Sequence, residues 1–241
     1  MQSGIYVGLS GQLALNQRLE TLAHNVANVS TAGFRAEEIK FDDIISRVPE
    51  NPVAFATARE TFLSEKSGGI MRTDNPLDVA VQGNAWLAID INGQQVYTRD
   101  GRMMISPNGD LQSLNGFPIL DIGGAPIGLN PNGSNPEISR DGTIFQDGER
   151  RGALGLFQFD PGVKLSRAPN SGVIGNQPAV AAVDFTVVGV QQGFIEQSNV
   201  NPVMEMTRLI EIHRLFDAVT NAMNLEGDSL EKAIQQLGPS V

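Results

Sequence analysis

The feature that most constrains this chain is an apolar seam near its C-terminal end. Asn201 can cap the start of a helix there, and Pro202 suits the first helical position because proline lacks the N–H that has no partner at that point. Apolar side chains then recur at steps of three and four residues, which is typical of a helix that packs along a partner. These residues, the C-terminal seam, are Leu209, Ile212, Phe216, Val219 and Met223. Residues 198–237 are therefore predicted to contain a long helix that needs a partner.

A second seam with the same spacing lies near the N-terminal end. Residues 3–29 are predicted to be helical, and the helix is expected to end at residues 30–33, where Gly33 can take positive φ. The apolar positions of this N-terminal seam are Leu15, Leu19, Leu22, Val26 and Val29. The simplest arrangement pairs the two terminal helices within the chain, so that the helical domain is discontinuous in sequence.

The middle of the chain has the pattern of a β domain. Asn-Gly and Asp-Gly pairs separate short apolar runs, and such pairs favour type I′ hairpin turns, which need positive φ at both central positions. The pairs stand at residues 92–93, 100–101, 108–109, 115–116, 132–133, 141–142 and 147–148. We expect an antiparallel meander with strands at residues 85–91, 95–99, 102–106, 111–114, 143–146, 153–160 and 179–190.

The predicted fold class is mixed α and β. A discontinuous, coiled-coil-like pair of terminal helices, residues 1–33 plus 198–241, carries an inserted antiparallel β domain, residues 77–197. Residues 34–76 hold no steady period and contain several turn signals. They are predicted to form an extended connector with short strands.

Composition restricts the possible partners. A net charge of −10 over 241 residues argues against nucleic acid and against anionic membrane surfaces as partners. No apolar run approaches the length of a membrane span, so direct membrane insertion is not expected. Residues 1–5 lack the basic and apolar regions of a cleaved secretory signal, so export, if it occurs, is expected to use another route.

Residues with the chemistry for catalysis are scarce. The chain has no cysteine, which excludes disulfides, thiolate metal sites and cysteine nucleophiles. Its two histidines, His24 and His213, lie in predicted helices and form no triad or zinc-ligand pattern. The aspartate-rich turns lack the alternating aspartates of a calcium loop. We therefore predict no catalytic, cofactor-binding or metal-binding residues.

The C-terminal helix is apolar on more than one side. Val203, Met206 and Ile210 fall on a second face of an ideal helical wheel, and Met204 and Leu215 point in a third direction. One partner cannot cover a helix of this kind, so its surplus faces are expected to be buried against other chains. The alternative is that the β domain of the same chain covers them.

The chain carries three motifs in a fixed order, at residues 22–35, at 77–83 with 97–101, and at 198–203 with 206–211. Together they resemble signatures of the flagellar rod and hook protein family. Residues 22–35 resemble the N-terminal signature, in which Asn25, Asn28, Gly33 and Phe34 shape the helix exit. Residues 77–83 with 97–101 resemble the opening of the β domain of the family, and residues 198–203 with 206–211 resemble its C-terminal signature. The motif residues of that last stretch are Ser198, Asn199, Asn201 and Pro202.

The resemblance implies a structural subunit of the bacterial flagellar rod, the drive shaft that crosses the periplasm. Proteins of this kind leave the cell through the flagellar type III export apparatus without a cleaved signal. Their terminal helices order when they pack against other copies and other rod proteins to form an axial tube, and the β domain lies outside. By this resemblance the seam residues form the assembly interface, with Leu209, Ile212, Phe216 and Val219 making the inner contact. The short chain and the Asn-Pro pair at residues 201–202 are more similar to proximal-rod than to distal-rod or hook-type members.

Two other classes of function are compatible with parts of the pattern. One is a non-catalytic binding module whose β domain holds a ligand and whose helices dimerise it. The other is an enzyme of unrecognised type, against which the scarcity of histidine, cysteine and metal-ligand patterns argues.

Overall fold

The computed structural model describes residues 2–45 and 54–237, and the chain divides into two compact units. The helical unit draws on Met1–Ala27, Glu37–Phe62 and Asn201–Val241, and the β unit on Asn28–Ala36 and Leu63–Val200. The chain therefore passes between the units four times, at 27/28, 36/37, 62/63 and 200/201. The three-part domain division made from the sequence stays a prediction.

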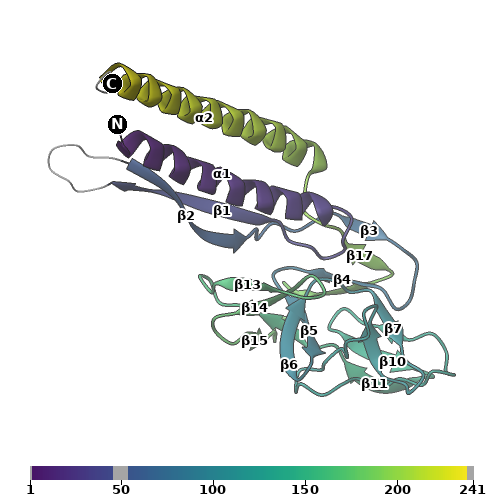
Figure 1. Ribbon diagram of the computed structural model, residues 1–241. Coiled ribbons are helices and arrows are strands. Elements are labelled where there is room, and N and C mark those ends of the chain that lie inside the picture. The colour runs from purple at the N-terminus through teal and green to yellow at the C-terminus, as the bar shows by residue number, and fades with distance from the viewer. Residues whose placement is uncertain (1, 46–53, 238–241) are drawn as a thin grey trace. The chain divides into compact units, whose positions relative to one another are not determined.

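Two long helices run side by side in the helical unit (Figure 1). These are α1, Gln2–Ala27, and α2, Pro202–Leu237. The Gln12 side-chain amide donates a hydrogen bond of 2.9 Å to the Thr220 hydroxyl. A two-stranded sheet of β1, Glu37–Ile45, and β2, Ala54–Leu63, lies in the stretch where the sequence predicted a connector with short strands.

The start of α2 has the local structure that the sequence predicts. The Asn201 side-chain oxygen accepts hydrogen bonds from the backbone N–H groups of Val203, at 3.1 Å, and Met204, at 3.2 Å. The Asn201 carbonyl accepts the first intrahelical bond, from the Glu205 N–H at 3.0 Å. Asn201 is thus the N-cap and Pro202 the first residue of the helix.

The β unit is built from short strands in several small sheets (Figure 1). The largest sheet has six strands in the order β13-β14-β6-β5-β12-β15, and β3 pairs with β17, β4 with β16, β7 with β8, and β10 with both β9 and β11. The ladders whose register is described are antiparallel. The strands are β3 Ile70–Arg72, β4 Val79–Gln82, β5 Trp86–Ile91, β6 Gln94–Thr98, β7 Met103–Ile105, β8 Leu111–Ser113, β9 Glu137–Ile138, β10 Thr143–Gln146, β11 Glu149–Ala153, β12 Leu156–Gln158, β13 Leu165–Ala168, β14 Gly172–Gly175, β15 Val180–Ala181, β16 Gly189–Gln192 and β17 Phe194–Glu196.

The β unit has two apolar clusters: a smaller one that contains Trp86, Tyr97 and Phe157, and a larger one that forms the main core. Its members come from strands and loops across the whole β unit, and they include Val79, Leu87, Ile89, Leu111, Ile119, Ile144 and Leu156, all of which are fully buried. The sequence prediction of a mixed α and β fold with antiparallel sheets is confirmed.

The predicted single meander is wrong. Asn92-Gly93 and Asp147-Gly148 do have positive φ at both residues and connect β5 to β6 and β10 to β11. Asp100-Gly101 has no positive φ and joins β6 to β7, which belong to different sheets. The Val79 N–H donates to the Gly101 carbonyl at 2.9 Å, so this dipeptide pairs with a distant segment instead of closing a hairpin.

The predicted strand at residues 179–190 is also wrong, because the chain leaves the extended conformation between β15 and β16. The Asp184 carboxylate accepts hydrogen bonds from the Thr186 N–H, at 2.9 Å, and from the Thr186 hydroxyl, at 2.5 Å. These bonds stabilise a local turn that an apolar run does not reveal.

Candidate assembly interface

The seam residues lie on the covered sides of the two helices. In α2, Ile212 is 1% exposed and the other C-terminal seam residues are half-buried. In α1, Leu22 is buried, and Leu15, Leu19 and Val26 are half-buried. The structure therefore brings the C-terminal seam and these four N-terminal seam residues into one unit of the same chain. Val29, which the sequence placed in the same seam, lies beyond the end of α1 and in the β unit. The role of the seam residues as contacts between chains stays a prediction.

The second and third faces of α2 are exposed. Val203 is 71% exposed and Ile210 is 53% exposed, although each lies within one turn of a covered residue. Met204, Met206, Leu215 and Leu225 of α2, and Tyr6, Leu9 and Leu13 of α1, are exposed as well. We call these nine side chains the exposed apolar set. Large apolar side chains exposed in such numbers on two paired helices are typical of a surface that another protein covers.

The end of α1 is fixed to the start of β1 by Asn25. This side chain is buried, and its amide donates to the Glu37 carbonyl and accepts from the Glu37 N–H, each at 2.9 Å. Asn28 closes the helix end, because its carbonyl accepts from the Thr31 N–H at 3.1 Å and its side chain accepts from the Thr31 hydroxyl at 3.2 Å.

Gly33 and Phe34, which follow the end of α1, are buried within the β unit. Gly33 has a φ of 67°, and its N–H donates to the Glu196 carbonyl at 2.8 Å. Phe34 is buried beneath Arg167, whose guanidinium carbon lies 4.3 Å from the centre of the phenyl ring. The positive φ that the sequence predicted for Gly33 is confirmed.

The C-terminal motif connects the same segments from the other end of the chain. The Asn199 side chain accepts from the Ala36 N–H at 2.7 Å and donates to the Lys66 carbonyl at 2.8 Å. The Ser198 hydroxyl accepts from the Val200 N–H at 3.3 Å. Asn199 therefore fixes the segment before α2 to two others, while Asn201 and Pro202 start the helix itself.

A buried ionic cluster, which the sequence reasoning missed, lies beside these motifs. The Glu196 carboxylate is 2.9 Å from the Arg35 guanidinium and 3.5 Å from the Arg99 guanidinium, and all three side chains are buried. Both guanidinium carbons lie over the Trp86 ring, 5.8 Å and 5.4 Å from its centre. Arg35 and Arg99 stand inside motifs that the sequence analysis recognised, but no pattern marks Glu196 as their partner.

Burial dominates the electrostatics of the cluster. Burial lowers the pKa of Arg99 to about 10, although the negative charge of Glu196 acts to raise it. Burial also lowers the pKa of Arg35, and Glu196 again acts in the opposite direction. Two cations share one carboxylate, so removal of the Glu196 side-chain charge would leave both buried arginines without their common partner.

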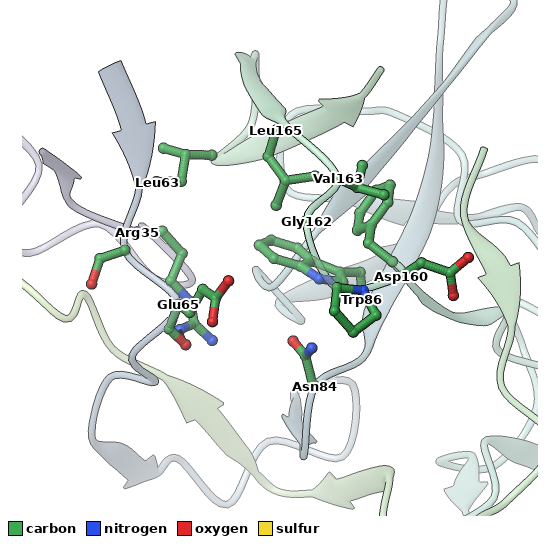
Figure 2. A pocket seen from close by; sticks show the side chains of 12 residues that line it. Arg35, Leu63, Glu65, Asn84, Trp86, Asp160, Gly162, Val163 and Leu165 are labelled. Carbon is green, nitrogen blue, oxygen red and sulfur yellow. Dashed lines mark hydrogen bonds between the residues drawn. The ribbon is translucent and has the colours of Figure 1, made fainter. Parts of the chain in front are cut away.

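A small cavity of about 180 Å³ adjoins the cluster (Figure 2). Arg35, Trp86, Glu65 and Asp160 line it, together with Leu63, Asn84, Val163 and Leu165. Within residues 2–45 and 54–237, no group of three or more histidine, cysteine or acidic side chains could hold a metal ion, and no helix is long and apolar enough to cross a membrane.

Comparison with known proteins matches three regions that overlap the three stretches singled out in the sequence. The family model described as "Flagella basal body rod protein" matches residues 5–35, "Flagellar hook protein FlgE/F/G D1 domain" matches residues 80–146, and "Flagellar basal body rod FlgEFG protein C-terminal" matches residues 191–236. The flagellar basal-body rod protein FlgF of Mesorhizobium japonicum is 45% identical over 238 residues, 99% of both chains. This chain belongs to the flagellar basal-body rod protein family.

Further relatives refine the comparison within the rod protein family. FlgF of Rhizobium meliloti is 45% identical over 240 residues, the full length of both chains. The flagellar basal-body rod protein FlgG of Bacillus subtilis is 26% identical over 264 residues, 97% of this chain and 98% of that one. The family membership inferred from the motifs is confirmed. The chain is a structural rod protein and not an enzyme, as the sequence predicted.

Proposed function

We propose that this chain is a subunit of the proximal flagellar rod and that it assembles through its terminal helices. The observation that carries the proposal is the identity of 45%, over the whole chain, to two relatives called FlgF. Identity to the FlgG proteins, at 25–27%, is much lower, which favours the FlgF-like position in the rod.

In this proposal the two seams form a coiled-coil-like pair within one chain. Gly8 supports close packing, because a Cβ at this position would lie 2.8 Å from the Met223 Cγ, so α2 approaches the backbone of α1 there. The bond from Gln12 to Thr220 holds the same two helices together one turn further along. The exposed apolar set then remains for neighbouring chains.

The exposed apolar set supplies the driving force for assembly. Burying a large apolar side chain stabilises a complex by roughly 1.5–3 kcal/mol relative to leaving it in water. Several such contacts per chain offset the entropy that is lost when neighbouring chains come together, so assembly is favoured once these side chains are buried between subunits. The partners we propose are other copies of this chain and other rod proteins.

Two further parts of the proposal follow from family membership. The chain reaches the basal body through the flagellar type III export apparatus, and the assembled helices transmit torque along the rod across the periplasm. The Asn199 side chain, which binds Ala36 and Lys66, supports a role in transmitting force, because it holds together β-unit segments that adjoin the chain crossings.

Deletion of the gene, followed by electron microscopy of isolated basal bodies, tests the function. We expect basal bodies that lack a complete rod and cells that do not swim, with both defects repaired when the gene is restored. A normal, rotating flagellum in the deletion strain contradicts the proposal. Basal bodies with a complete proximal rod but without a distal rod would instead place the chain at the FlgG position.

A further inference from the structure

The segments through which the chain enters and leaves the β unit are gathered at one place. On the β-unit side, the four crossings adjoin three stretches, residues 28–36, 63–68 and 196–200. They are far apart in sequence, and no element of regular sheet joins all three. Side chains join them instead, and the ionic cluster described above lies at their centre.

Arg35 and Glu196 make the connections between the three stretches. Arg35 donates to the carbonyls of Glu65, at 2.8 Å, and Lys66, and its guanidinium pairs with the Glu196 carboxylate. The same carboxylate accepts from the Gly68 N–H at 3.1 Å. Each of the two charged groups therefore contacts at least two of the stretches.

Backbone contacts reinforce the same junction. The Ser64 N–H donates to the Ala36 carbonyl at 2.8 Å, and the Gly33 N–H donates to the Glu196 carbonyl at 2.8 Å. Asn199 adds its bonds to Ala36 and Lys66. If one stretch shifted, the bonds to both others would break.

Arg99 connects this junction to the core of the β unit. Its guanidinium donates to the carbonyls of Val81, at 3.0 Å, and Gly83, at 2.6 Å, and it contacts Glu196 at 3.5 Å. Val81 belongs to β4, a strand whose side chains are part of the apolar core. The junction is thus attached to the most buried part of the unit.

We propose that the Arg35–Glu196–Arg99 cluster is a load-sharing joint. It holds the three stretches to one another and to the core, so that force on any one crossing is distributed over all of them. The inference rests on the proposed rod function, which requires force to pass between the units without local unfolding. Glu196 is the key residue, because its carboxylate is the anion shared by both arginines.

Hydrogen exchange of the full-length chain, followed by mass spectrometry, tests the joint. Glu196→Gln keeps the size of the side chain but removes the charge. We expect backbone amides in residues 63–68 and 196–200 to exchange about tenfold faster or more, with β8 amides unchanged, because the loss opens the junction locally. The matched control is Glu149→Gln, which removes the charge of an exposed ion pair with Arg151.

Two results overturn the joint: unchanged exchange in residues 63–68 and 196–200, or equal acceleration throughout the β unit. If Glu196→Gln does not fold, Arg35→Lys decides. Lysine keeps the positive charge, but its single ammonium cannot reproduce the planar fork that reaches Glu65 and Glu196 together. Faster exchange confined to residues 63–68 and 196–200 in Arg35→Lys supports the proposed joint, and unchanged exchange there contradicts it.

Motility tests the role under load. A strain whose only copy carries Glu196→Gln is expected to swim no better than the deletion strain, while Glu149→Gln swims like the parent. Parent-level motility with Glu196→Gln overturns the load-sharing role. The two proposals can fail separately. If the proposed rod function is wrong, the deletion strain swims, but faster hydrogen exchange in the purified Glu196→Gln chain would still show that the cluster holds the three stretches together.

Discussion

At the residue scale, the helix exit depends on one glycine. Gly33 has positive φ, and an added Cβ would collide with the backbone of Arg99 and Asp100. We expect Gly33→Ala to lower the free energy of unfolding by about 3 kcal/mol, because strain and overlap act together. Gly116→Ala is the control: φ is 82° and nothing lies within 4 Å, so a loss of about 1 kcal/mol is expected. Equal losses in urea unfolding would contradict this account.

The carboxyl group of Asp141 provides a residue-scale test of pH dependence. Its pKa is lowered, first by the hydrogen bond from the Thr143 N–H and then by the Thr143 hydroxyl. The folded pKa lies below the unfolded value of about 3.9, so this stabilisation is present above that value and is lost as pH falls through the folded pKa. Carbon NMR titration should give a pKa below the ordinary value, and Asp141→Asn should remove this part of the acid sensitivity. Titration at or above the ordinary value would refute the prediction.

At the element scale, α2 depends on its cap. Asn201→Ala removes the acceptor of the Val203 and Met204 N–H groups, and we expect a loss of about 1 kcal/mol in the stability of the helical unit. Asn201→Ser retains a side-chain oxygen and should lose much less. Thermal melts followed by circular dichroism, with exchange rates of the two amides, measure the effect. Identical behaviour of the alanine and serine variants would count against the cap.

At the scale of the whole molecule, Ile210 and Ile212 separate folding from assembly. Ile212 is buried and Ile210 is exposed on the same helix. We expect Ile212→Gln to destabilise the purified chain by about 3 kcal/mol, and Ile210→Gln to change its stability by less than about 0.5 kcal/mol. Ile210→Gln should nevertheless reduce the number of complete rods in a strain that carries it as the only copy, because it places an amide in the surface that neighbours cover. Parent-level rod numbers with Ile210→Gln would exclude this face from assembly.

The sequence determined those features whose energy is local. Asn201-Pro202 caps and starts a helix by bonds within one turn, and Asn92-Gly93 closes a hairpin with its own backbone angles, so both could be recognised from a few residues. The terminal motifs likewise identified the family. The surplus apolar faces of α2 were also predictable, since helical periodicity alone places Val203 and Ile210 away from Ile212.

Only the tertiary structure decided which distant segments meet. Asp100-Gly101 has the residues that favour a hairpin turn, but it does not form one. The Gly101 carbonyl instead accepts a hydrogen bond from the Val79 N–H, and β6 and β7, on either side of it, belong to different sheets. Glu196 pairs with Arg35 from the opposite end of the chain, and nothing in the sequence around either residue marks the other. The physical reason is that contacts between distant segments depend on the topology and burial of the complete fold. The Glu196 carboxylate stabilises Arg35 and Arg99 only once the folded core has brought the three side chains together.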